Sequence, residues 1–379
     1  MNSFKDKTIL LISPEAWGQN FVSKHHYASY LSKNNEVFFL NPVTASKTNP
    51  FSDVECRTRR IKDGLTEVSY KNLLPKLNLL PKKIQEKIYS KQARQIQKAL
   101  KIEKFDIVWS FDPFRFFNQK VWYADHYIYH TVDVHFNKCF EETIAETSDL
   151  VLLSSELLRA KLQKSNERIY YVGHASDLDN FEAGIKSPVD LKKDRITAGL
   201  VGNFNNNVDY DLIEKIALKN EHIDFIFVGP YNENNLGNDT ATVAENIARL
   251  SRLKNVRFIG SVPSEDIIKY LAFFDINLVL YREDKRDIII NPHKIMGYLY
   301  SGKITICSWF NEYKNAEKEL IYMTDKNAEI PDAVFEVSRN LNYWNSPEFV
   351  EKRRAFSIKN SYQSKLDYIF RLLYDKEFS

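Results

Sequence analysis

Cysteine is scarce in this sequence, and its few cysteines form no recognisable pattern. Cys56, Cys139 and Cys307 are the only three among 379 residues, and no two of them have the C-x-x-C spacing. The sequence therefore indicates neither a disulfide framework nor a zinc site, and no His/Asp/Glu spacing typical of metal ligands stands out. We expect reduced, packed thiols and no metal.

Glycine and proline are also few, at 11 and 12 residues, which excludes a fibrous or low-complexity chain. No stretch approaches the ~20 apolar residues that span a bilayer, and the run after "MNSFKDK" is shorter than the roughly 7–15 residues of a signal-peptide core. We therefore expect a cytoplasmic globular protein. Apolar residues make up 44% of the chain, and its length fits two domains of roughly 180 residues each.

Positive charge is concentrated in one segment, 71–104, which has ten Lys/Arg and two Glu. Leucine and isoleucine are interspersed with these cations, a mixture that suits an anionic membrane surface. An amphipathic helix that packs its leucines on the first domain has the same pattern, so both interpretations stay open. The membrane interpretation places the protein on the inner face of the cell membrane. Nothing in the sequence resembles a nucleic-acid-binding module, so we expect no nucleic acid as a partner.

Strand-like apolar runs alternate with helix-length amphipathic segments, which is typical of parallel α/β sheets. The first series of strands falls at 8–13, 36–42, 105–113, 127–133, 149–155 and 168–174. A second series follows a polar stretch and falls at 196–202, 223–229, 256–262, 276–282 and 303–309. The pattern predicts two doubly wound, Rossmann-like domains, 1–184 and 185–355, that face each other across a cleft, followed by a helix within 356–379.

The segment "NPHKIMGYLYSGK" places Pro292, His293 and Lys294 in the first turn of a predicted helix. Proline suits such a position because its missing N–H would have no partner there. The unpaired N–H groups of the turn, the partial positive charge of the helix end and the lysine ammonium all favour an anion. The alternative is a solvated surface lysine.

A strand-to-helix turn at Gly202 and Asn203 is a second candidate for ligand binding. Glycine permits a close backbone approach to a ligand, and the asparagine amide can donate to a phosphate or sugar. A turn that serves packing alone is the alternative. Asp209 or Asp211 is the expected N-cap of the helix that follows.

The segments "FVGP", "VRFIGSVPSEDIIKYLAFFDINLVLYRED" and "NPHKIMGYLYSGK" follow one another in a familiar order and spacing. This series resembles the donor-binding domain of retaining GT-B glycosyltransferases of family 4, and within that family the transferases of teichuronic acid biosynthesis. In the first half, "SDLVLLSSELLRAKL" and "YYVGHASDLDNF" are similar to family segments as well. The resemblance therefore extends over nearly the whole chain.

The resemblance implies a GT-B fold whose second domain binds a nucleotide sugar and whose C-terminal helix, 356–379, crosses back to the first domain. The diphosphate would contact Lys294 and Arg282, and the base would lie near Gly260 and Val262. The implied reaction is transfer of a sugar, with retention, from a UDP- or GDP-linked donor to a glycan or lipid-linked acceptor in cell-surface polysaccharide synthesis. No cofactor is implied, because the main catalytic help is charge neutralisation of the departing diphosphate.

Three positions depart from the family pattern. Gly297 stands where the family has the glutamate that holds the ribose, Ile304 replaces a proline, and Ile289 stands in the place of an upstream glutamate. The ribose could then be held differently, for instance by Asp284 or Asp287. The lost glutamate also leaves a non-catalytic, GT-B-like scaffold of a polysaccharide assembly complex as an alternative function. A sugar-nucleotide epimerase is a further alternative.

The first half supplies candidates for the acceptor side of the site. Four lie in the opening loop and the helix after it: Trp17, Gly18, His25 and His26. Adjacent helical residues point about 100° apart, so at most one of the two histidines faces a ligand. His130 and Asp133 lie near the carboxyl end of a predicted strand, where ligands gather, and we expect them to be catalytic. A structural role is the alternative for each histidine.

Overall fold

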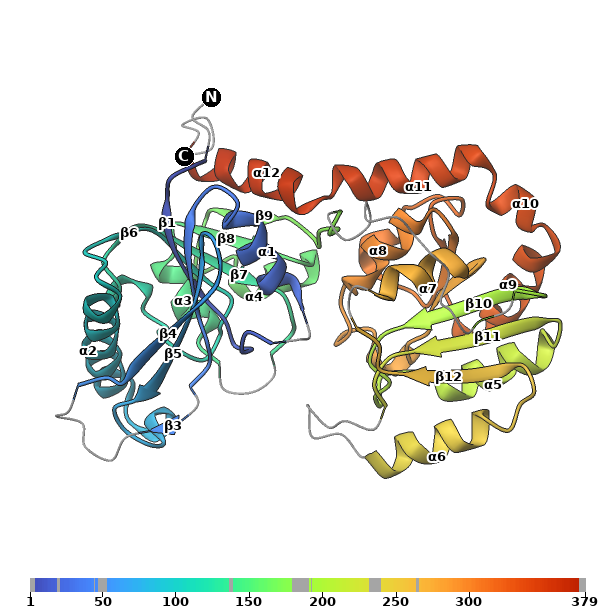
Figure 1. Ribbon diagram of the computed structural model, residues 1–379, viewed down its shortest axis with the longest axis horizontal. Helices are drawn as coiled ribbons and strands as arrows, with labels where there is room; N and C mark the ends of the chain where they lie inside the picture. Colours follow the sequence, from blue (N-terminus) through green and yellow to red (C-terminus); the bar gives the residue numbers. More distant parts are fainter. Residues whose placement is uncertain are drawn as a thin grey trace. The chain divides into compact units, whose positions relative to one another are not determined.

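The computed structural model describes residues 4–18, 21–43, 45–46, 53–135, 139–178, 191, 193–231, 240–263 and 266–374. The chain divides into two compact units (Figure 1). Unit 1 comprises Met1–Gly173 and Gln363–Ser379, and unit 2 comprises His174–Tyr362. The sequence places a domain boundary between residues 184 and 185, which lie outside the described residues.

Unit 1 has a nine-stranded sheet in the order β3-β5-β2-β1-β6-β7-β8-β9, and β4 pairs with β5. Apart from the antiparallel β4–β5 pair, all neighbours run parallel. Central strands of such a sheet are buried on both faces, which explains their continuous apolar runs. The strands are β1 (Thr8–Ile12), β2 (Glu36–Leu40), β3 (Ala45–Ser46), β4 (Cys56–Lys62), β5 (Leu65–Asn72), β6 (Phe105–Ser110), β7 (Ala124–Thr131), β8 (Leu150–Leu153) and β9 (Ile169–Tyr171).

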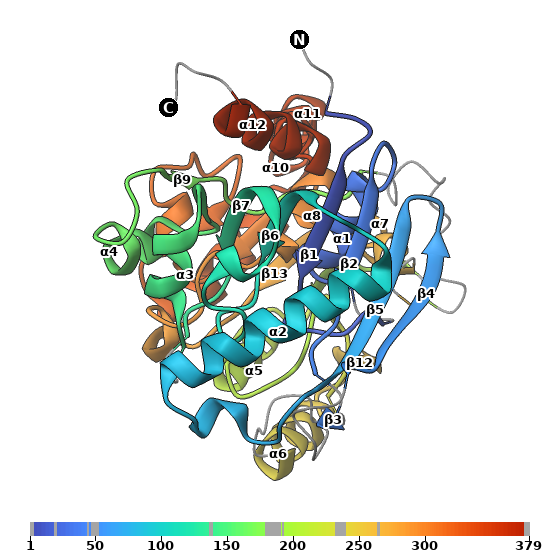
Figure 2. The same ribbon diagram turned by 90° about the vertical axis from the view of Figure 1, so that its left-hand side faces the viewer.

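Helices α1 (Ser23–Leu31) and α2 (Lys82–Leu100) cover opposite faces of this sheet (Figures 1 and 2). The shorter helices α3 (Glu141–Thr147) and α4 (Arg159–Leu162) follow β7 and β8. Most of the last helix, α12 (Tyr362–Tyr374), belongs to unit 1 as well. Its Phe370 stacks on Phe4, and the carbonyl of Leu372 accepts a hydrogen bond from Arg168.

The β4–β5 hairpin is absent from the strands that the sequence pattern predicts. Its first strand, "CRTRRIK", has four basic residues and is exposed along most of its length. Such a strand lacks the apolar alternation that marks a half-buried strand. Charged side chains on an edge strand also discourage pairing with another chain, which suits the position of β4 at the margin of the sheet.

Unit 2 has a six-stranded parallel sheet in the order β12-β11-β10-β13-β14-β15. This is the order of the doubly wound dinucleotide-binding fold, and the direction of winding reverses between β10 and β13. The predicted α/β class with two doubly wound sheets is therefore confirmed. The strands are β10 (Ile196–Val201), β11 (Ile223–Val228), β12 (Val256–Gly260), β13 (Ile276–Val279), β14 (Ile304–Cys307) and β15 (Tyr322–Met323).

Two separate hydrophobic cores lie on the two faces of the unit 2 sheet. One is formed with α5 (Tyr210–Lys219), α6 (Thr240–Leu250) and α9 (Ile330–Arg339), and the other with α7 (Ile267–Phe273) and α8 (Lys294–Ser301). Helices α10 (Leu341–Trp344) and α11 (Pro347–Lys359) follow, and α11 packs against α8. Within the described ranges, no helix combines the length and the hydrophobicity that crossing a bilayer requires.

Candidate functional site

Three glycines shape the carboxyl edge of the unit 2 sheet. Gly202 follows β10, Gly229 follows β11 and Gly260 ends β12, with φ of 154°, 141° and 86°. The Gly202 N–H donates to Val228 at 2.9 Å, and the Gly229 N–H donates to Gly260 at 2.8 Å. A Cβ atom on Gly229 would lie 1.9 Å from the Gly202 carbonyl oxygen. The missing side chains therefore let three adjacent strand ends approach closely at the point where such folds bind ligands.

Lys294 brings its ammonium group to this edge. A Cβ atom on Gly202 would lie 2.2 Å from Lys294 Nζ, so the lysine occupies the space that the glycine leaves. The ammonium also lies 5.2 Å from the centre of the Tyr281 ring. None of the described carboxylates lies within ion-pair distance of it. The edge therefore carries a half-buried cation without an anionic partner in the described part of unit 2.

Tyr298 determines where Lys294 lies. The fully buried Tyr298 hydroxyl accepts a hydrogen bond from the Val201 N–H at 2.7 Å and donates one to the Val201 carbonyl at 2.9 Å. Lys294 precedes Tyr298 by four residues and so lies on the same side of α8, one turn nearer the helix start. The two hydrogen bonds between Tyr298 and Val201 therefore place Lys294 beside the residue that follows Val201, Gly202.

The start of α8 leaves its first N–H groups without a side-chain cap. The helix begins at Lys294 with His293 as N-cap, and no side chain accepts a hydrogen bond there. Pro292 is buried and precedes the helix by two residues, whereas the exposed His293 adjoins it. Gly297 is half-buried and lies three residues after Lys294, on the same side of the helix. This arrangement favours an anion at the helix start.

The other expected donor-site residues surround this centre less closely. Arg282 is exposed and forms two hydrogen bonds with Asp284, at 2.9 and 2.8 Å, while its N–H donates to Asn207 in the loop after β10. Asn203 is exposed in the turn beside Gly202, and the half-buried Val262 packs on the core under α7 and α8. Asp284, one of two carboxylates suggested to replace the family glutamate, is thus paired with Arg282.

In unit 1, the expected acceptor-side residues of the opening loop are held tightly. His25 is 1% exposed; its Nδ1 accepts from the Val22 N–H at 3.2 Å and its Nε2 lies 3.0 Å from the Ala16 carbonyl. Burial lowers the pKa of His25 to about 4, so the ring is neutral and Nε2 donates. The Trp17 ring contacts His25 at 5.4 Å, and the half-buried His26 contacts Phe21. His25 therefore fixes this loop.

Gly18 is exposed at the end of the same described loop, and a Cβ atom added there would lie 3.9 Å from the Ala16 carbonyl oxygen. His130 lies at the carboxyl end of β7, 1% exposed, in a cluster with Tyr27, Trp109 and Phe111. Asp133 is exposed in the loop after that strand. The structure thus places the two expected catalytic residues in different surroundings, one among aromatic rings and one at the surface.

Sequence reasoning missed a buried arginine that joins four strand ends of unit 1. Arg115 pairs with Asp112 at 2.6 Å and donates to the Ser13 carbonyl at 2.7 Å. It also donates to the Asn41 carbonyl and the Tyr70 hydroxyl, each at 2.9 Å. Ser13, Asn41 and Asp112 lie just after the ends of β1, β2 and β6, and Tyr70 lies near the end of β5. No sequence signal could have identified the contact, because half of the partners are backbone carbonyls far away in the chain.

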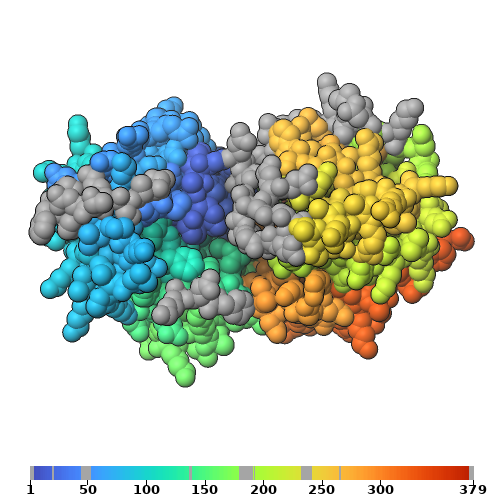
Figure 3. Space-filling model, turned by 90° about the horizontal axis from the view of Figure 1, so that it is seen from below, coloured from blue at the N-terminus to red at the C-terminus, as the bar shows by residue number. Residues whose placement is uncertain are grey.

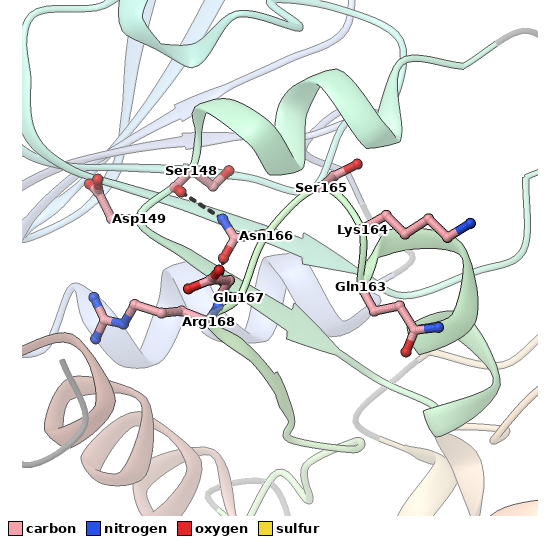
Figure 4. A pocket seen from close by; sticks show the side chains of 8 residues that line it. All are labelled: Ser148, Asp149, Gln163, Lys164, Ser165, Asn166, Glu167 and Arg168. Carbon is pink, nitrogen blue, oxygen red and sulfur yellow. Dashed lines mark hydrogen bonds between the residues drawn. The ribbon is translucent and has the colours of Figure 1, made fainter.

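A depression of about 560 Å³ lies at the opposite, amino-terminal edge of β8 and β9 (Figure 4). It is lined by Ser148, Asp149, Gln163, Lys164, Ser165, Asn166, Glu167 and Arg168. Asn166 donates to the carbonyls of Ala145 and Ser148, which ties the turn to α3. Because parallel sheets bind ligands at the carboxyl edge, this depression is not the candidate site. No group of three or more His, Cys, Asp or Glu among the described residues could hold a metal ion.

Comparison with known proteins identifies a sequence relative and many structural neighbours. No family model matches the chain. Over 192 residues it is 22% identical to a Bacillus subtilis (strain 168) protein named glycosyltransferase TuaH, of teichuronic acid biosynthesis. The match covers 49% of this chain and 46% of the relative, so the chain aligns with about half of that protein's length.

The solved structures match nearly the whole chain. A glycosyltransferase from Rickettsia africae ESF-5 has a TM-score of 0.71 at 14% identity, covering 98% of this chain and 99% of that one. An E. coli structure described as trehalose-6-phosphate bound with UDP-2-fluoro glucose has a TM-score of 0.71 at 10% identity, covering 96% and 98%. Sucrose-phosphate synthase from Thermosynechococcus elongatus has a TM-score of 0.67 at 12% identity, covering 97% and 99%.

The fold is that of the GT-B glycosyltransferases. Within that class, the sequence resembles the glycosyltransferases of teichuronic acid biosynthesis, which confirms the resemblance inferred from the motifs.

Proposed function

We propose that this protein is a glycosyltransferase that takes a sugar from a nucleotide-diphosphate donor bound at the carboxyl edge of unit 2. The Lys294 ammonium beside Gly202 carries the proposal, because a half-buried cation without a carboxylate partner suits an anionic ligand. No side chain caps the start of α8, and the partial positive charge of this helix end also favours an anion. The relative and the structural neighbours support this reading, since their names include glycosyltransferases and a bound UDP-sugar analogue.

The chemistry requires little besides charge neutralisation. As the bond between the anomeric carbon and the diphosphate breaks, negative charge grows on the departing oxygen, and Lys294 with the α8 N–H groups would stabilise it. Arg282 would add a second positive charge if its ion pair with Asp284 opens. We propose transfer with retention to a glycan or lipid-linked acceptor in cell-surface polysaccharide synthesis. The base would lie near Gly260 and Val262.

The ribose would be bound without the family glutamate. Gly297 follows Lys294 by three residues on the same helix and offers only backbone. Asn203 is exposed in the turn beside Gly202 and would donate to the sugar or a phosphate. Asp287 is exposed nearby in sequence and is the remaining carboxylate candidate for the ribose hydroxyls, because Asp284 pairs with Arg282.

The test is nucleotide binding by Lys294→Ala. Losing a charged hydrogen-bond partner costs about 1.5–3 kcal/mol, so affinity should fall roughly 10- to 150-fold. Lys318→Ala is the matched control, because the Lys318 ammonium also lies over a tyrosine ring, that of Tyr322, whose hydroxyl bonds to α9. A thermal-shift screen first finds which UDP, GDP, ADP and dTDP sugars raise the melting temperature of the protein. Calorimetric titration with those sugars then measures the affinity of both variants. Equal affinities for the two variants would refute the assignment.

On the acceptor side, we propose that the carboxyl edge of the unit 1 sheet receives the acceptor. We also keep the division of the chain that the sequence predicts: an acceptor-binding domain 1–184, a donor-binding domain 185–355 and a C-terminal helix within 356–379. Trp17 and Gly18 would contact the acceptor, since their loop is held by His25 and by the bond from the Trp17 N–H to Asn41 at 2.9 Å. Asp133, exposed after β7, is the more accessible of the two expected catalytic residues.

We also propose that the segment 71–104 attaches unit 1 to an anionic membrane, on the cytoplasmic face. Its apolar residues divide into two groups: Leu73 and Leu77 are 1% and 3% exposed, whereas Leu79 and Ile84 are 73% and 47% exposed. The light-blue segment that leads into α2 lies at the surface in Figure 3. Exposed lysines accompany the two exposed apolar residues: Lys76, Lys83 and Lys87. An apolar and basic surface of this kind suits the membrane interface.

Liposome sedimentation tests the attachment. Each basic residue near an anionic surface contributes about 1 kcal/mol, so binding should require anionic lipid and weaken at high salt. Changing Lys76, Lys83 and Lys87 to glutamate should abolish it. The matched control changes three exposed lysines of unit 2 to glutamate: Lys215, Lys219 and Lys254. Equal binding to neutral liposomes, or none to anionic ones, would leave the packed-helix interpretation.

A further inference from the structure

An aromatic side chain, that of Tyr231, lies at the carboxyl edge of the unit 2 sheet, two residues after Gly229. The side chain is half-buried, so part of it is accessible to solvent. A Cβ atom built on Gly260 would lie 3.9 Å from Tyr231 Cε1. Apart from the glycine's two neighbours in the chain, no other heavy atom of the described residues lies within 4 Å of that position. The Gly260 backbone and the edge of the tyrosine ring therefore border a common space at the end of β12.

The Tyr231 ring is held in place by an aromatic cluster of the same unit. It meets Phe258 of β12 edge to face, with 6.1 Å between the ring centres and 73° between the ring planes. Phe258 in turn contacts Phe204 and Phe227, at 5.5 and 5.0 Å. The Phe204 N–H donates to the carbonyl of Pro230, the residue before Tyr231, at 3.0 Å. Because the ring is already ordered, a ligand that contacts it would lose little affinity to further ordering.

The strand spacing separates this ring from the position proposed for the diphosphate. Strand β12 is the second neighbour of β10 in the sheet, and adjacent strands lie about 4.8 Å apart, so Gly260 lies roughly 10 Å from Gly202 along this edge. Lys294 Nζ lies beside Gly202. In a nucleoside diphosphate the ribose separates the base from the phosphates. A nucleotide that lies along the ends of β10, β11 and β12, with its diphosphate at Lys294, would therefore bring its base to Tyr231.

We propose that Tyr231 is the residue on which the nucleobase of the donor stacks, with the base lying over the Gly260 backbone. This inference rests on the proposed function and deepens it, because it names the side chain that binds the base. Every base has a π-face, so an aromatic ring stacks on purines and pyrimidines alike. Tyr231 therefore contributes affinity for nucleoside diphosphates as a class, and hydrogen bonds elsewhere would choose among the bases.

Two substitutions distinguish stacking from simple packing, because Tyr231 also packs against the core of unit 2. Tyr231→Leu keeps an apolar side chain over this core and removes the ring, whereas Tyr231→Phe keeps the ring. In calorimetric titrations with UDP, GDP, ADP and dTDP, Tyr231→Leu should lower the affinity roughly 5- to 150-fold for each nucleotide that binds the wild type. Tyr231→Phe should retain the wild-type affinity. Wild-type affinity in Tyr231→Leu would overturn the stacking role.

Inorganic pyrophosphate separates the loss of stacking from a general distortion of the sheet edge. It has two phosphates and no base, so its affinity, measured by displacement of the bound nucleotide, should be the same in Tyr231→Leu as in the wild type. Lys294→Ala should weaken pyrophosphate and nucleotides together. If Tyr231→Leu weakened pyrophosphate as much as it weakened the nucleotides, the tyrosine would act only by supporting the edge, and the stacking role would be overturned.

Tyr343→Leu is the matched control. The Tyr343 ring of α10 also meets a core aromatic ring edge to face, that of Trp344, at 5.3 Å and 81°. This tyrosine belongs to the opposite edge of the sheet, because Asn345 at the end of α10 accepts from the Ile304 N–H at the start of β14, at 2.9 Å. Tyr343→Leu should keep the wild-type nucleotide affinity. A loss as large as that of Tyr231→Leu would assign both effects to a loosened core and overturn the stacking role.

The same titrations separate this inference from the proposed function. Nucleotide binding that Lys294→Ala weakens and Tyr231→Leu leaves unchanged overturns the stacking role and keeps the donor site. Binding that both variants weaken, with pyrophosphate affinity lost only in Lys294→Ala, supports both assignments. A wild-type protein that binds none of the four nucleotides and none of their sugars overturns the proposed function and the stacking role with it.

Discussion

Replacing Tyr298 by phenylalanine tests whether the hydrogen bonds of the Tyr298 hydroxyl hold α8 against the unit 2 sheet. Val201 lies at the end of β10, and its N–H and carbonyl both bond to the Tyr298 hydroxyl. Strands β10 and β13 pair only at Ala198 and Gly199 of β10, so no residue of β13 is a hydrogen-bond partner of Val201. Tyr298→Phe keeps the ring in its buried place and removes only the oxygen.

The expected loss follows from the two backbone groups that the phenylalanine leaves unpaired. A buried donor or acceptor without a partner costs about 1–3 kcal/mol, so the free energy of unfolding of unit 2 should fall by about 2–6 kcal/mol. For a unit of this size, 1 kcal/mol corresponds to about 2–4 °C, so Tm should fall by roughly 4–24 °C. Nucleotide affinity should also fall about 3- to 10-fold, because Lys294 is carried by the loosened helix.

Thermal unfolding and calorimetric nucleotide titration measure the two effects. Tyr270→Phe is the matched control: Tyr270 is a partly buried tyrosine of α7 whose hydroxyl makes no hydrogen bond to the described residues. The control should lose little stability and no affinity. If the Tm of Tyr298→Phe equals that of Tyr270→Phe, the hydroxyl does not hold the helix, and our account of the Lys294 position is wrong.

Two further predictions concern one glycine and one histidine. Gly202→Ala puts a Cβ 2.2 Å from Lys294 Nζ at φ 154°, so it should weaken nucleotide binding about 10-fold or more. Gly260→Ala is the control: its φ of 86° is also strained, but among the described residues its Cβ approaches only Tyr231, at 3.9 Å, so it should weaken binding less. The pKa of His25 is lowered from 6.5 to about 4, so between these values the unfolded chain binds the extra proton and stability falls as pH decreases. The total loss is about 3 kcal/mol and is complete below about pH 4. Urea unfolding from pH 7.5 to 5 should show this decline in the wild type and a shallower one in His25→Gln; parallel curves would contradict it.

The sequence by itself determined the fold class and pointed to the centre of the proposed donor site. The apolar runs of β10, β11 and β14 and the helical period of α8 are local patterns, so they could be read from neighbouring residues alone. The proline, lysine and glycine of "NPHKIMGYLYSG" likewise mark the start and end of one helix. Asp209, expected as an N-cap, does accept from the Leu212 N–H at 3.0 Å.

Tertiary structure alone decided which distant groups meet. The Tyr298 hydroxyl bonds to Val201, 97 residues away, and Arg115 reaches the Ser13 carbonyl, 102 residues away. Such contacts depend on strand order, and their backbone partners carry no residue-type signal, so no local pattern encodes them. The buried state of His25 is decided in the same way, because desolvation depends on every neighbour in space. The sequence therefore determined which helix start and strand ends could bind a ligand, and the packing decided which side chains can act there.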